Sequence, residues 1–78
     1  MPQEQIVTEE GMAALAMRFR DQAGKTRAQA ARDMGVAQTS IFHAEESPTQ
    51  SLIKLRIRMI EAYSPYRVVG PVYHFKKK

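Results

Sequence analysis

The sequence predicts a mainly α-helical fold that ends in a short β element. Three observations support this fold class. Apolar residues recur at helical spacing over residues 9–45. Gly24 and Gly35 stand where the first two of these helical patterns end. The segment YRVVGPVYHF, residues 66–75, is rich in strand-forming side chains. We therefore expect about four helices followed by a β element.

The length of the chain limits what this fold can contain. A domain of 78 residues buries only ~60% of the surface of its unfolded chain, so its stability is marginal. The chain has no cysteine, which excludes disulfide bonds and thiolate metal sites. Self-association is then the cheapest further source of stability. We divide the chain into an N-terminal arm (residues 1–7), one helical domain (8–63), and a C-terminal β element with a basic tail (64–78).

The net charge of +4 is distributed unevenly. Residues 1–50 hold five Lys or Arg and seven Asp or Glu, whereas residues 51–78 hold seven Lys or Arg and one Glu. A basic segment of this kind indicates a polyanionic partner, although a solvated face has the same composition. No apolar run approaches the ~20 residues of a membrane span, and the polar start is unlike a signal peptide. We expect a cytoplasmic protein without a membrane partner.

The first two helices are marked by their ends. Thr8 is a hydroxyl cap, and two acidic residues follow it beside the positive end of the helix dipole, so the first helix should cover about residues 9–22. Gly24 then ends this helix. Thr26 caps a second helix over residues 27–34, whose small apolar side chains let another helix approach closely.

A third helix fits residues 38–45, directly after Gly35. Glycine takes the left-handed conformation that closes a helix in one step. Two short helices joined in this way can present the second one to a DNA major groove. The alternative is a plain helical hairpin, but its solvent face would carry Lys and Glu. This helix instead carries side chains suited to base edges and thymine methyls, namely Gln38, Thr39, Ser40, Phe42 and His43.

This stretch resembles the helix-turn-helix of the Xre/Cro family, the lambda repressor-like DNA-binding domains. The matching residues are Thr26, AQAA at 28–31, MGV at 34–36, Gln38, Ile41 and Glu45. The similarity covers residues 12–47 well and 48–63 weakly. It implies a lambda repressor-like helical bundle in a prokaryote or phage. Its function would be to regulate transcription at the nucleoid, as a repressor that binds a palindromic double-stranded DNA operator as a homodimer.

The resemblance also implies roles for single residues. Base reading falls to the third helix, through Gln38, Thr39, Phe42 and His43. The amide of Gln38 can pair bidentately with adenine. The expected phosphate contacts are at the starts of the helices, where the positive end of the helix dipole attracts anions. The residues are Thr26, Arg27, Ser40 and Lys54. For each of these polar residues, an ordinary solvated position is the alternative reading.

Residues 51–63, SLIKLRIRMIEAY, allow two interpretations. As a helix, the segment has an apolar stripe, a cap at Ser51 and Pro65 after its end. As a strand, its apolar and basic residues alternate with a period of two. The helix also has an argument against it, because Arg56 would fall on the apolar side of its helical wheel. The resemblance favours the helix, which we expect. The strand would give three helices and a β-hairpin, an α+β fold like that of the small phage Cro repressors.

Residues 66–75 are interrupted by Gly70-Pro71, which predicts an edge strand, a bent strand or a very short hairpin. We expect the helices to leave its valines and aromatic residues with few partners within one chain, and an apolar edge strand is a liability in a monomer. We therefore expect a homodimer interface at Val69, Tyr73 and Phe75. The last three lysines should form a disordered tail.

An alternative function comes from departures from the family pattern. Lys25 stands at a usually apolar position, Ala37 lacks the usual capping hydroxyl, and the Glu45–Glu46 pair places acids near the expected phosphates. The acidic pair, together with the weak charge of residues 1–50, favours a protein-interaction module, such as an antitoxin that neutralises a toxin through its C-terminal strand. An enzyme is not expected, because one solvent-facing helix offers no pocket and no oxyanion donors. We expect no cofactor, metal or small-molecule substrate.

Overall fold

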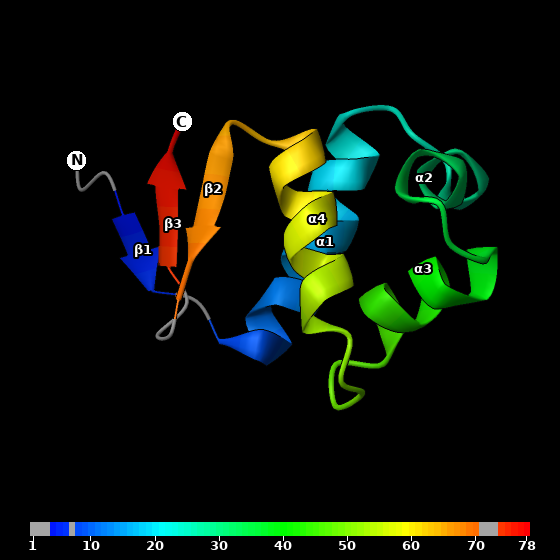
Figure 1. Cartoon of the computed structure of the whole chain (residues 1–78), viewed down its shortest axis with the longest axis horizontal. Helices are drawn as coiled ribbons and strands as arrows, with labels where there is room; N and C mark the ends of the chain where they lie inside the picture. The colour runs from blue at the N-terminus through cyan, green and yellow to red at the C-terminus, as the bar shows by residue number, and fades with distance from the viewer. Residues whose placement is uncertain (1–3, 7, 71–73) are drawn as a thin grey trace.

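The computed structural model describes residues 4–6, 8–70 and 74–78, whose arrangement is shown in Figure 1. The elements follow in the order β1 (Glu4–Ile6), α1 (Glu9–Gln22), α2 (Arg27–Met34), α3 (Gln38–Glu46), α4 (Ile53–Tyr63), β2 (Tyr66–Val69) and β3 (His74–Lys77). The prediction of a mainly α fold with about four helices and a C-terminal β element is confirmed. Within the described part of the chain, no helix is long and apolar enough to cross a bilayer.

The ends of α1 and α2 are set by the local signals in the sequence. The Thr8 hydroxyl accepts a hydrogen bond from the Gly11 N–H at 3.0 Å. Thr26 and Gln29 form a reciprocal capping box, in which each side chain accepts from the backbone N–H of the other. Gly35 closes α2 in the left-handed region, at φ 70°. Both helices therefore have the predicted bounds.

Residues 53–63 form a helix, so the Cro-like alternative with a strand in this region is wrong. Arg56 argued against a helix because it lies on the apolar face, and it is indeed fully buried. Its guanidinium donates to the carbonyls of Ala44 at 2.9 Å, Ser47 at 2.7 Å and Gln50 at 2.9 Å. These carbonyls lie at or just beyond the C-terminal end of α3, where helix carbonyls lack partners. Ser51 does not cap α4, which begins after Leu52 without a side-chain cap.

The core lies between α1 and α4, which pack along each other in the middle of the molecule (Figure 1). The helices α2 and α3 lie on one side of this pair, and the sheet lies on the other side. The buried apolar residues that pack together in this core are Met12, Ala16, Ala30, Ala31, Met34, Ile41, Ala44, Leu55, Met59, Ile60 and Phe75. The alanines of α2 and α3 allow the close approach that the sequence predicts.

The sheet has the order β1-β3-β2, with β3 antiparallel to both neighbours. Residues 66–69 and 74–77 thus form two antiparallel strands, in which Val68 lies opposite Phe75. The Val68 N–H donates to a Glu61 carboxylate oxygen at 3.0 Å, and the Tyr66 N–H donates to the Ser64 hydroxyl at 3.1 Å. These N–H groups of β2 are therefore occupied by the chain itself.

The expectation that Phe75 has few partners within one chain is wrong. Its side chain is 2% exposed and lies against the rings of Phe19 and Tyr66, with centroid distances of 6.2 and 5.6 Å. Val69 is half-buried, and Tyr73 lies outside the described residues. Phe75 therefore serves the core of its own chain, because the sheet folds back on α1.

The lysines at the C-terminus also differ from the expected disordered tail. Lys76 and Lys77 belong to β3. The Lys78 ammonium donates to the backbone carbonyls of Glu61 and Ser64, which lie at the end of α4. This part of the chain is thus tied to the sheet and to α4.

Candidate nucleic-acid interface

The turn between α2 and α3 fixes the direction of the third helix. Gly35 takes φ 70° and ψ 36°, and its N–H donates to the Arg32 carbonyl at 3.3 Å. The Val36 N–H donates to the Ala31 carbonyl at 3.0 Å, and the Val36 side chain packs against the core. The turn is therefore closed by hydrogen bonds and held by an apolar side chain, as the sequence predicts for a helix-turn-helix.

The helix α3 has one buried face and one exposed face. Ile41 and Ala44 are fully buried in the core. The four predicted base-reading residues, Gln38, Thr39, Phe42 and His43, are all exposed. Phe42 is 40% exposed, and within the described part of the chain it is the one large apolar side chain with such exposure. The predicted base readers therefore share one solvent-facing surface.

A buried carboxylate anchors the C-terminal end of α3. The Glu45 side chain is 0% exposed and accepts two hydrogen bonds from Arg20 of α1, at 2.5 and 3.0 Å. It also accepts one from the Arg27 Nε of α2 at 2.9 Å. Arg20 makes one more bond, to the Lys25 carbonyl at 2.7 Å. Glu45 therefore joins three helices, and its buried charge is balanced by two guanidinium groups.

Arg27, a predicted phosphate contact, is engaged on the surface of α3. Its Nη2 donates to the exposed carboxylate of Glu46 at 2.6 Å, in addition to its bond with Glu45. Its guanidinium carbon lies 5.1 Å from the centroid of the Phe42 ring, within cation–π range. The hydrogen bonds with Glu45 and then Glu46 raise the pKa of Arg27 above its ordinary value. The positive charge of Arg27 is thus compensated within the chain.

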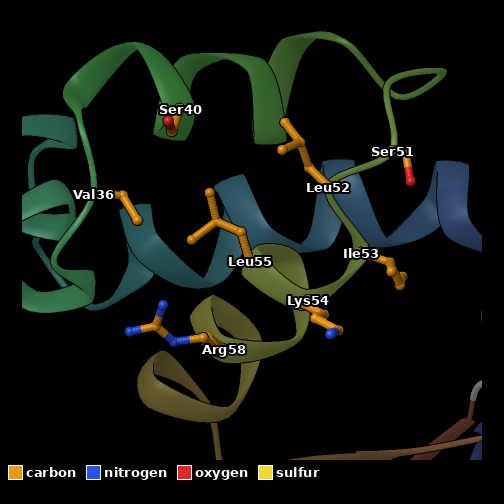
Figure 2. A pocket seen from close by; sticks show the side chains of 8 residues that line it. All are labelled: Val36, Ser40, Ser51, Leu52, Ile53, Lys54, Leu55 and Arg58. Carbon is orange, nitrogen blue, oxygen red and sulfur yellow. The ribbon is translucent and has the colours of Figure 1, made fainter.

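The four predicted phosphate contacts fall into two separate places. Thr26 and Arg27 lie at the start of α2, where the Thr26 hydroxyl already accepts from the Gln29 N–H. Ser40 of α3 and Lys54 of α4 instead line a common groove (Figure 2). Ser40 is half-buried, whereas Lys54 is exposed. The structure therefore brings the four residues together in pairs, on the α2 side and on the α4 side of α3.

The groove in Figure 2 lies between α3 and the first turns of α4 and has a volume of about 410 Å³. Its walls are mostly apolar, with Val36, Leu52 and Leu55 pointing into the space between the two helices. Arg58 lies along one side and donates to the Met34 carbonyl at 2.6 Å. The groove therefore carries two cations and an apolar floor beside α3.

Ser40, His43 and Glu46 follow one another at intervals of three residues on α3, a spacing that could imitate a catalytic triad, but their side chains do not bond to one another. His43 shares a hydrogen bond of 3.1 Å with the Ser47 hydroxyl, while Glu46 pairs with Arg27 and Ser40 faces the groove. The described residues also contain no group of three or more His, Asp or Glu side chains arranged to hold a metal ion.

Sequence reasoning missed Glu45, Arg20 and Arg56 as supports of this surface. A buried Glu between two arginines leaves no periodic signal, because its partners lie 25 and 18 residues away in the chain. The match of Glu45 to the family pattern was the one available sign that this position matters.

No family model matches the chain, and the searches of curated proteins and of solved structures find no match either. The geometry of α2, α3 and their neighbours is therefore the basis for assigning a function.

Proposed function

We propose that this protein is a sequence-specific DNA-binding regulator of transcription, most simply a repressor, that inserts α3 into the major groove. The observation that carries the proposal is the exposed surface of α3, where Gln38, Thr39, Phe42 and His43 face solvent together. Side chains of this kind read base edges and thymine methyls. The proposal includes no catalytic activity and places the protein in the cytoplasm, on the nucleoid.

The support behind α3 favours this role. A reading helix must keep its orientation when it meets DNA, and α3 is held at several points. Ile41 and Ala44 are buried in the core, Glu45 is bonded to α1 and α2, and Arg56 binds the carbonyls at its end. Figure 1 shows α3 at one end of the molecule, away from the sheet. The resemblance to the Xre/Cro family adds to this argument.

The neighbours of α3 offer contacts for the DNA backbone. Thr26 and Arg27 stand at the start of α2, and Lys54 stands in the first turn of α4. Backbone contacts position a protein on DNA, while base contacts supply specificity. We assign positioning to these three residues and to Ser40.

The test is a selection of binding sites from random double-stranded DNA with the full chain. We expect one enriched motif, and a Gln38→Ala variant should lose discrimination at one base pair of that motif. Gln22→Ala, at the exposed end of α1, is the matched control and should select the same motif as the unmodified chain. A selection without any enriched motif would overturn the proposal.

The proposed regulator acts as a homodimer on a palindromic operator. The occupied N–H groups of β2 and the burial of Phe75 argue against a dimer built by pairing residues 66–75 edge to edge. Val69, which is half-buried, keeps partial exposure for such a contact. Sedimentation of the chain with and without operator DNA measures the stoichiometry directly, and a Val69→Arg variant tests the contribution of that position.

A second candidate function is a protein-interaction module, such as an antitoxin. Two observations favour it. Arg27 is compensated by Glu45 and Glu46 on the surface of α3. The exposed cations Arg67, Lys76 and Lys77 lie on the sheet, at the other end of the molecule (Figure 1). The test is co-purification with the product of an adjacent gene. An Arg67→Glu, Lys76→Glu variant should lose that complex, while a Gln38→Ala variant should retain it.

A further inference from the structure

The geometry of α3 points to the class of base pair that it reads. We propose that the protein recognises A·T pairs by receiving thymine methyl groups in a hollow beside Phe42. This inference rests on the proposed DNA-binding function and names the target of the same surface. The hollow has a volume of about 390 Å³ and is lined by Arg27, Gln38, Thr39 and Phe42.

The helix α3 lacks the Arg or Lys side chain that usually binds guanine in the major groove. The commonest specific contact to a G·C pair is an Arg or Lys that binds guanine O6 and N7. The helix, QTSIFHAEE, contains neither residue. The guanidinium that lines the hollow is that of Arg27, and its Nε and Nη2 are bonded to Glu45 and Glu46. These two bonds hold the Arg27 guanidinium against the carboxylates, so guanine could be read only through the N–H groups that they leave over.

Phe42 is held at the exposed surface of α3 by contacts with two neighbouring side chains. Its ring lies under the Arg27 guanidinium and meets the His43 ring edge-on, at a centroid distance of 5.4 Å. These two contacts hold an apolar ring at the surface that is 40% exposed. The thymine methyl is the apolar group that base pairs display in the major groove. A fixed, exposed aromatic ring on a reading helix is therefore suited to that group.

The chemistry around the ring suits the same base pair. Thr39 adds its own methyl group to the hollow, and Gln38 adds an amide that can bind adenine N6 and N7. Adenine and thymine are thus read by adjacent side chains on one surface. An apolar side chain of a partner protein would fill the same hollow, and the experiment separates that occupant from DNA.

The experiment uses the full chain and the motif selected from random DNA. Each thymine of the motif is replaced in turn by deoxyuridine, which removes the methyl group and leaves the pairing unchanged. We expect at least one replacement to weaken binding about 4-fold, the value for burying one methyl group. Phe42→Ala should bind thymine and deoxyuridine sites equally. Ile57→Ala, a truncation of a half-buried residue on α4, should keep the difference.

The outcomes separate this inference from the proposed function. A G·C motif, indifference to every deoxyuridine, or a Phe42→Ala variant that keeps the full thymine preference would overturn the inference and leave DNA binding intact. Because Phe42 is exposed, Phe42→Ala should fold, and circular dichroism checks this. Should that variant fail to fold, the deoxyuridine series with the unmodified chain still decides. If random DNA yields no motif, both proposals fail, and a partner protein becomes the occupant to seek.

Discussion

The carboxylate of Glu45 accepts two hydrogen bonds from the guanidinium of Arg20, across 25 residues of sequence. One comes from Nε at 2.5 Å and the other from Nη2 at 3.0 Å. Paired bonds of this kind fix the angle between the two groups as well as their distance. The C-terminal end of α3 is therefore tied to α1, which itself packs along α4.

Removing this carboxylate should destabilise the fold. Glu45→Gln leaves Arg20 buried without its charged partner, and breaking one side of a buried ion pair costs about 3 kcal/mol. Urea denaturation measures the loss. Glu46→Gln removes a carboxylate whose side chain is 46% exposed, so its cost should stay below about 1 kcal/mol. Equal losses in the two variants would show that burial of Glu45 has no energetic consequence.

Glu46 should compete with DNA phosphate for Arg27. In Glu46→Gln, the Arg27 Nη2 loses its charged acceptor on the protein and can bind a phosphate instead. We expect tighter DNA binding and a salt slope that is steeper by about 0.9, the value for one more phosphate contact. Glu10→Gln, an exposed position at the start of α1, corrects for the general effect of removing one negative charge. An equal gain in both variants would contradict direct competition.

Arg56 should stabilise the fold through the hydrogen bonds that its guanidinium donates, and not through the volume of its side chain. Arg56→Met keeps an apolar side chain of similar length but leaves the carbonyls of Ala44, Ser47 and Gln50 without this donor. Each buried polar group left without a partner costs about 1–3 kcal/mol, so the total loss should exceed about 2 kcal/mol. Lys54→Ala, exposed on the same helix, should change stability by less than about 0.5 kcal/mol. A stable Arg56→Met variant would mean that water replaces the guanidinium.

Tyr63 should make stability fall at high pH. Burial, followed by its hydrogen bond to Asp33, raises the pKa of Tyr63 from 10.0 to about 12. Between these values the unfolded chain releases the proton and the folded chain keeps it, so the unfolded state binds fewer protons. The contribution of the protonated Tyr63 phenol to the free energy of unfolding is therefore complete below pH 10, and it is lost as the pH rises through about 12.

Alkaline titration followed by tyrosinate absorbance checks this value. Tyr63→Phe should remove the step near pH 12 and flatten the fall in stability. Asp33→Asn should move the step to lower pH, because the carboxylate opposes ionisation of the phenol. If the titration curve of Tyr63→Phe were unchanged, the absorbance step near pH 12 would belong to another tyrosine.

The helices could be predicted from sequence because their signals are local. Thr8 and Thr26 cap the helices that follow them, and Gly35 adopts the left-handed conformation that glycine allows. The burial of Arg56 could not be predicted in this way, since its acceptors lie on a segment 6 to 12 residues earlier. On a helical wheel such an arginine interrupts the apolar face and argues against a helix. In the structure its guanidinium donates hydrogen bonds to carbonyls at and just beyond the end of α3.

The candidate site was predictable in its exposed part only. The periodicity that buries Ile41 and Ala44 also leaves Gln38 and Phe42 on the other face. The contacts of Arg27 depend on how α2 and α3 cross, which no local pattern specifies. The same holds for Phe75, whose burial requires the strands to return over α1.

The central place of β3 in the sheet has a consequence for synthesis of the chain on the ribosome. The strand β1 is made before the four helices, yet its partner is β3, with Ile6 opposite His74 and Glu4 opposite Lys76. The core is also incomplete until Phe75 has been added. During translation the four helices can begin to form as they emerge, but β1 has no strand to pair with until residue 77 has left the exit tunnel. This sheet therefore forms only after the four helices have been made, when β1 meets β3.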